Sequence, residues 1–106
     1  PISNAPLAMV ILADAEITDT WIEDAAIMAT IVQVTAHSLG LGSCWVQVRE
    51  RFTTDGQSVD SFVKDLLNIP DKYQVSAIIS IGYPAEDKDA YTKDKLDYNK
   101  VHHNKF

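Results

Sequence analysis

The chain has 106 residues, of which 46% are hydrophobic and 23% charged, and its formal net charge is −6. This length predicts a single domain, and the composition is ordinary for a globular protein. Residues 1–85 hold ten acidic and four basic side chains, whereas residues 86–106 are balanced. The acidic body argues against a nucleic-acid partner, and no apolar run is long enough to span a membrane.

The single cysteine, Cys44, excludes an internal disulfide, which is typical of a reducing compartment, so we expect a cytoplasmic protein. Its apolar neighbours predict a small buried side chain, because no base or cation nearby in the sequence would activate the thiol. The histidines and acids do not follow the spacing of a metal site or of paired catalytic carboxylates. We therefore expect neither a metal nor a catalytic side chain.

The first half of the chain predicts one strand and one long helix. Residues 7–13 form a continuous apolar run that suits a strand buried on both faces. Thr20 and Glu23 then have the spacing of a capping box at a helix start. The helix should cover residues 21–39 and end at Gly40. Its apolar residues extend well beyond one stripe, so we expect it to be buried from more than one side.

The second half predicts a short extended segment at residues 44–48, an amphipathic helix at 59–67 and a strand at 75–81. This order indicates an α+β or α/β pattern, and of the two we expect the α+β class. We expect residues 1–85 to form the core and residues 86–106 to form an extended arm. Three apolar residues of that arm are spaced as anchors for another surface, namely Tyr98, Val101 and Phe106.

These elements contain more apolar surface than so short a chain can cover by itself. A partner chain, or a further part of the same polypeptide, should therefore pack against the long helix and the strands.

Several segments, in their order and spacing, resemble the carboxy-terminal portion of the FMN-dependent nitroreductase family. They are residues 21–24 (Trp-Ile-Glu-Asp), 36–45 (Ala-His-Ser-Leu-Gly-Leu-Gly-Ser-Cys-Trp), 68–70 (Asn-Ile-Pro), 79–84 (Ile-Ser-Ile-Gly-Tyr-Pro), 93–95 (Lys-Asp-Lys) and 101–106 (Val-His-His-Asn-Lys-Phe). The resemblance covers essentially the whole chain. The family's amino-terminal FMN-binding segment, which carries an Arg-Arg-Ser-like motif, has no counterpart in these residues.

The resemblance implies a partial nitroreductase-like fold, with a central sheet flanked by a long buried helix and with an extended arm packed on a partner subunit. It also implies a homodimer that binds FMN and passes hydride from NAD(P)H to nitroaromatics or quinones. An alternative is a truncated, non-catalytic fragment that dimerises and does not bind the cofactor.

The resemblance assigns two groups of residues to the FMN site. Residues Trp45, Val46, Gln47 and Val48 should pass close to the flavin ring, where a backbone N–H can bond flavin N5; the alternative is a plain buried strand. Lys93 and Lys95 should reach the FMN phosphate. Alternate residues of an extended chain point the same way, so both ammonium groups could converge on it; the alternative is a solvated tail.

Overall fold

The computed structural model describes residues 2–106 and contains three strands and two α-helices. Along the chain they are β1 (Leu7–Asp14), α1 (Trp21–Ser38), β2 (Gly42–Gln47), α2 (Val59–Leu67) and β3 (Tyr73–Gly82), followed by two short 3-10 turns, η1 (Lys93–Lys95) and η2 (Tyr98–Lys100). The predicted α+β class is confirmed.

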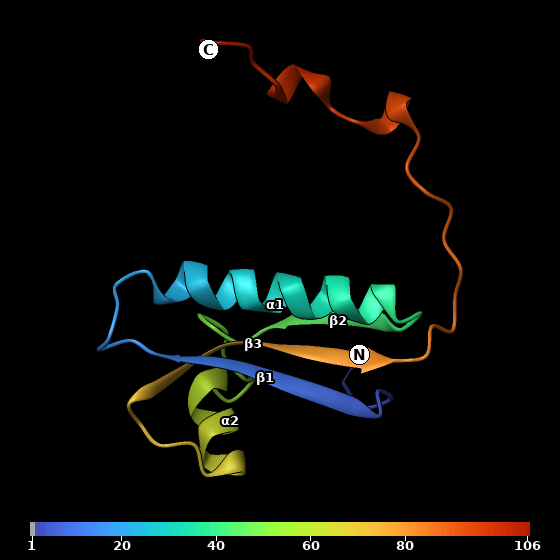
Figure 1. Cartoon of the computed structure of the whole chain (residues 1–106). Helices are drawn as coiled ribbons and strands as arrows, with labels where there is room; N and C mark the ends of the chain where they lie inside the picture. Colours follow the sequence, from blue (N-terminus) through green and yellow to red (C-terminus); the bar gives the residue numbers. More distant parts are fainter. Residues whose placement is uncertain (1) are drawn as a thin grey trace.

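The strands form one antiparallel sheet in the order β1-β3-β2 (Figure 1). β3 lies in the centre, and seven of its residues in succession, from Val75 to Ile81, are buried. Helix α1 covers one face of the sheet and the shorter α2 covers the other (Figure 1). Each face of β3 therefore lines a separate hydrophobic cluster.

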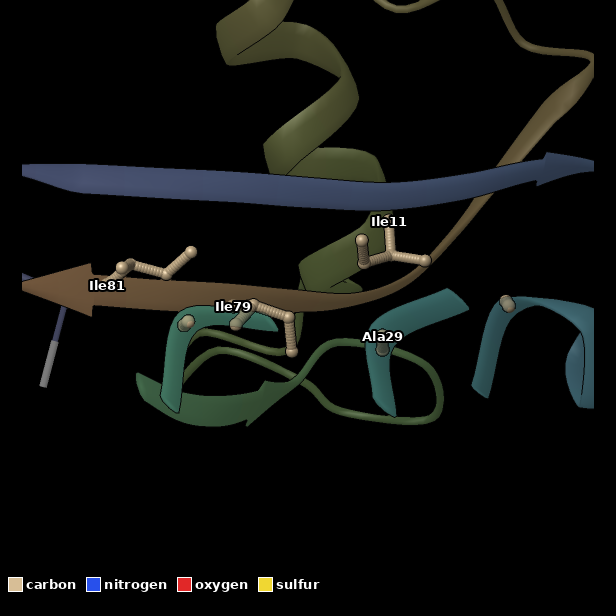
Figure 2. Packing of buried hydrophobic residues seen from close by; sticks show 6 residues of the cluster. Ile11, Ala29, Ile79 and Ile81 are labelled. Atoms are coloured by element: carbon tan, nitrogen blue, oxygen red, sulfur yellow. The ribbon is translucent and has the colours of Figure 1, made fainter. Parts of the chain in front are cut away.

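The larger cluster lies between the sheet and α1. Figure 2 shows Ile79 and Ile81 of β3 with Ile11 of β1 and Ala29 of α1 in this space. Alanines at the contact let the helix backbone approach the strands closely; Ala25, Ala29 and Ala36 are the buried residues of α1. The smaller cluster, on the α2 side, consists of Val48, Val63, Val75 and Ile78.

The prediction that the first strand is buried on both faces is wrong for this chain. β1 is an edge strand, and Leu7 and Met9 are 51% and 40% exposed. Of its residues only Ile11 is buried. The reason is that α1 covers one face of β1 in part, and α2 is too short to cover the other.

Helix α1 is buried on its alanine face, and a second apolar face points away from the sheet. Ile27, Met28, Ile31 and Val34 on that face are 55–64% exposed. The predicted capping box does not form, because the Thr20 hydroxyl donates to the Asp24 carboxylate at 3.3 Å and caps no backbone N–H. Within residues 2–106, neither α1 nor α2 has the length and apolarity needed to cross a bilayer.

The chain leaves the sheet after β3 and continues as an arm that lies apart from the core (Figure 1). Tyr98 and Val101 are 59% and 58% exposed, and Phe106 is fully exposed. The only aromatic contact within the arm joins the rings of His102 and Phe106, whose centroids lie 4.1 Å apart.

Candidate functional site

The turn between α1 and β2 leads the chain from the helix to the β2 edge of the sheet. Gly40 follows the helix with a φ of 73°, a left-handed conformation that glycine adopts without the steric cost that other residues meet. The Leu41 N–H closes the turn by donating to the Ala36 carbonyl at 2.9 Å. β2 then begins at Gly42 and runs along β3.

β2 is an edge strand, so half of its backbone polar groups have no strand to pair with within residues 2–106. The Val48 N–H donates to the Ser76 carbonyl at 3.2 Å and marks the end of the ladder with β3. Because bonded and non-bonded pairs alternate along antiparallel strands, the ladder bonds fall at every second residue counted back from Val48. The N–H groups of Trp45 and Gln47 therefore point to the open edge.

The side chains of residues 45–48 alternate between the two faces of the sheet. Trp45 packs with the α1 cluster, whereas Val46 and Val48 pack with the α2 cluster. Val48 is 1% exposed, and its carbonyl accepts the Arg51 N–H at 3.1 Å. Val48 therefore anchors the segment, and the backbone groups left to meet a ligand are those of Trp45 and Gln47.

Two shallow hollows lie at the ends of β2. The one at its start is lined by Gly42, Ser43 and Cys44 and extends to Lys88. The pKa of Lys88 is raised by the hydrogen bond from its ammonium group to the Glu86 carboxylate, and by the charge of that carboxylate. The hollow beyond the end of β2 is lined by residues that include Trp21, Val48, Arg49, Arg51 and Phe52. Trp45, Val46 and Gln47 line neither of these two hollows.

Lys93 and Lys95 lie on the arm, apart from β2 (Figure 1). The expectation of an extended backbone there is wrong, because these residues form the 3-10 turn η1. In such a turn, side chains three residues apart align and those two apart do not. A single copy of the chain therefore does not bring the two parts of the predicted FMN site together.

Cys44 is exposed, so the prediction of a buried thiol is wrong. Its side chain alternates with that of Trp45 and so faces away from α1, toward the side of the sheet that α2 covers only near Val46 and Val48. Within residues 2–106 the structure places no three His, Cys, Asp or Glu side chains together as metal ligands.

The β2 edge fits the ring of FMN better than its phosphate. The outward N–H groups of Trp45 and Gln47 are donors that match the nitrogen and carbonyl acceptors of an oxidised flavin ring. A phosphate needs nearby cations, and the nearest candidates along the chain are Arg49, which pairs with Glu50, and Arg51. The arm lysines do not reach β2 within one copy.

Sequence reasoning did not single out the role of Arg49. Its carbonyl accepts a hydrogen bond from Gln47 Nε2 at 2.9 Å, and Gln47 Oε1 accepts one from Trp45 Nε1 at 2.9 Å. Alternation along the strand places the side chains of Trp45 and Gln47 on one face, but Arg49 lies beyond the end of β2 and contributes its backbone carbonyl, which no residue pattern indicates.

The sequence and the fold of this chain are similar to those of known proteins. The family model described as the Nitroreductase family matches residues 2–83. An FMN-dependent nitroreductase structure from Clostridium difficile R20291 is 54% identical, with a TM-score of 0.91 over 97% of this chain and 60% of that chain. A nitroreductase structure with bound FMN from Desulfitobacterium hafniense DCB-2 is 15% identical, with a TM-score of 0.67 over 98% of this chain and 53% of that chain, and shares the fold.

A curated relative from Archaeoglobus fulgidus carries the name "Putative NADH dehydrogenase/NAD(P)H nitroreductase". It is 30% identical over 108 residues, which cover 97% of this chain and 59% of the relative. This chain therefore spans 53–60% of the length of these three relatives.

Proposed function

Because this chain belongs to the nitroreductase family, we propose that it builds one wall of the FMN site in a flavin-dependent oxidoreductase. When bound, FMN would supply the redox chemistry, which is hydride transfer from NADH or NADPH and two-electron reduction of a nitroaromatic compound or a quinone. The chain supplies binding, orientation and the shape of the pocket. The proposed location of this enzyme is the cytoplasm.

The open edge of β2 is the observation that carries this proposal. The Gln47 N–H points outward from an edge strand, and no loop or turn hydrogen bond of residues 2–106 uses it. In the proposed complex this N–H donates to flavin N5, and Trp45 and Val46 form the neighbouring wall. Val48 holds this wall to the core through its buried side chain.

The proposed assembly is a homodimer in which the core, residues 1–85, and the arm, residues 86–106, contact different copies. The arm of one copy packs on the other and brings Lys93 and Lys95 to the FMN phosphate. Two observations support this arrangement: the arm lies apart from its own core (Figure 1), and α1 exposes an apolar face.

Anaerobic reduction of the chain mixed with FMN tests the activity. We expect NADH or NADPH to bleach the visible absorbance of bound oxidised flavin, and added menadione, a quinone, to restore it. A dimer that leaves added FMN free in solution would contradict the proposal and support the non-catalytic alternative.

A proline substitution tests the outward N–H itself. Gln47→Pro removes the donor and leaves the ladder with β3 intact, because proline is tolerated where an edge strand faces outward. The matched control is Gln47→Leu, which also loses the carboxamide and keeps the backbone N–H. Relative to this control we expect the Kd for FMN to rise about tenfold, as the loss of one hydrogen bond predicts. Equal affinities of the two variants would contradict the proposed contact.

A further inference from the structure

A chain of side-chain hydrogen bonds runs along one face of β2 at its end. The Trp45 indole Nε1–H donates to Gln47 Oε1 at 2.9 Å, and Gln47 Nε2 donates to the Arg49 carbonyl oxygen at 2.9 Å. Trp45 and Gln47 are both half-buried. The Gln47 carboxamide is therefore held at both of its ends.

The two partners allow this carboxamide a single orientation. An indole N–H can only donate and a carbonyl oxygen can only accept, so exchanging the oxygen and the nitrogen of Gln47 would break both bonds. A glutamine without such partners would sample many rotamers. The bonds to Trp45 and Arg49 restrict the Gln47 side chain to one of them.

The backbone around Gln47 is also anchored on the opposite face and at the strand end. Val46 and Val48 pack with the α2 cluster on the opposite face. At the strand end, the N–H groups of Val48 and Arg49 both donate to the Ser76 carbonyl, at 3.2 and 3.0 Å. The Gln47 peptide is thus held by side-chain contacts on both faces of the sheet and by backbone hydrogen bonds at the end of β2. These contacts fix the direction of its outward N–H.

We infer that Trp45 and Gln47 form a positioning pair that aims the Gln47 backbone N–H at the flavin and so sets FMN affinity and the reduction potential of bound FMN. This inference rests on the proposed FMN site. The N–H can donate to N5 only in the oxidised ring, because N5 carries a proton after two-electron reduction. A misdirected N–H destabilises the oxidised complex more than the reduced one, so it raises the potential.

Two variants break the hydrogen-bonded chain and keep the backbone donor. Trp45→Phe removes the indole N–H and keeps an aromatic ring, and Gln47→Leu removes the carboxamide and leaves an apolar side chain one atom shorter. Gln47→Glu keeps an acceptor for Trp45 and loses the donor to Arg49. Trp21→Phe is the matched control, because it makes the same chemical change outside this chain of bonds.

The first measurement needs no cofactor and follows hydrogen exchange of the two tryptophan indole N–H groups by 15N NMR. We expect exchange at the Trp45 indole to become about five- to tenfold faster in Gln47→Leu, as the loss of one hydrogen bond predicts. In Gln47→Glu the exchange should stay close to that of the wild type, because the acceptor remains.

The second measurement is of FMN binding and potential. We expect Trp45→Phe and Gln47→Leu each to raise the Kd for oxidised FMN about five- to tenfold and to raise the potential of bound flavin. Trp21→Phe should stay within about twofold of the wild-type Kd.

The outcomes separate this inference from the function on which it rests. If the wild-type chain does not bind FMN, the proposed function fails and the inference fails with it. If the wild type binds FMN and both chain-breaking variants match Trp21→Phe in affinity and potential, the inference is overturned and the proposed function stands. Unchanged indole exchange in Gln47→Leu also overturns the inference, since the hydrogen-bonded chain then does not hold in solution.

Discussion

Gly82 marks a place where the end of β3 lies against the amino-terminal segment. A Cβ added at Gly82 would come within 2.9 Å of Pro6 Cδ, whereas a Cβ at Gly42, its partner across the sheet, would make an ordinary contact of 3.5 Å with Pro84 Cα. The two glycines therefore differ in the room around them, although they sit opposite each other.

We expect Gly82→Ala to lower the free energy of unfolding by about 1–3 kcal/mol, because the methyl group overpacks a filled site. Gly42→Ala should stay within about 1 kcal/mol of the wild type, since its φ is not left-handed and the added methyl has space. Urea unfolding of both variants makes the comparison. Equal losses would show that the contact with Pro6 does not limit this position.

For single residues, the sequence predicted the position of the β2 segment better than it predicted which side chains are exposed. The glycine corner and the ordered motifs located residues 45–48, and the family they indicated is confirmed. The exposure of Cys44 and the turn at Lys93 were not predicted. Both depend on what lies beside the chain in space, and neighbours along the sequence do not reveal that.

The two helices begin in different ways. Ser58 is extended at the start of α2, and its hydroxyl accepts the Ser61 N–H at 3.0 Å. Thr20 precedes α1 with φ −88° and ψ 15°, and its side chain caps no backbone N–H. A side-chain cap therefore stabilises α2 and not α1.

We expect Ser58→Ala to cost about 1 kcal/mol of stability, which is typical for the loss of a capping side chain. Thr20→Ala should cost less than about 0.5 kcal/mol, because no backbone bond is lost. Thermal unfolding followed by circular dichroism compares the two. A larger loss for Thr20→Ala than for Ser58→Ala would contradict the capping geometry.

The elements differ in how well the sequence predicted them, for physical reasons. The range 59–67 coincides with α2 because its amphipathic period and its flanking residues agree. Residues 75–81 lie within β3, whose apolar side chains have cover on both faces. β1 has an equally apolar sequence and lies at an edge, since hydrophobicity alone does not say which strand occupies the centre.

The whole molecule is more extended than a compact domain of its length. Its radius of gyration is 16.9 Å, compared with about 13 Å expected for a compact domain of about 100 residues. The arm accounts for the excess, because it lies apart from the core (Figure 1). The exposed apolar face of α1 and the detached arm are the two surfaces that the proposed second copy would cover.

A charge on the exposed face of α1 tests this assembly. We expect Ile31→Glu to raise the dimer dissociation constant at least tenfold, since an unpaired carboxylate is costly to bury in an apolar interface. Ser61→Glu adds the same charge at an exposed position of α2, on the other side of the sheet, and should leave the constant within about threefold. Sedimentation equilibrium gives both constants. Equal weakening by the two variants would argue against an interface at Ile31.

Sedimentation velocity of the wild-type chain with added FMN, followed in both the protein and the flavin absorbance bands, tests the dimer and its cofactor site together. We predict that the flavin absorbance moves with a species of twice the chain mass. Protein that sediments at the mass of a single chain, with the flavin left behind as free FMN, would contradict the proposal that this chain closes around a second copy to hold the cofactor.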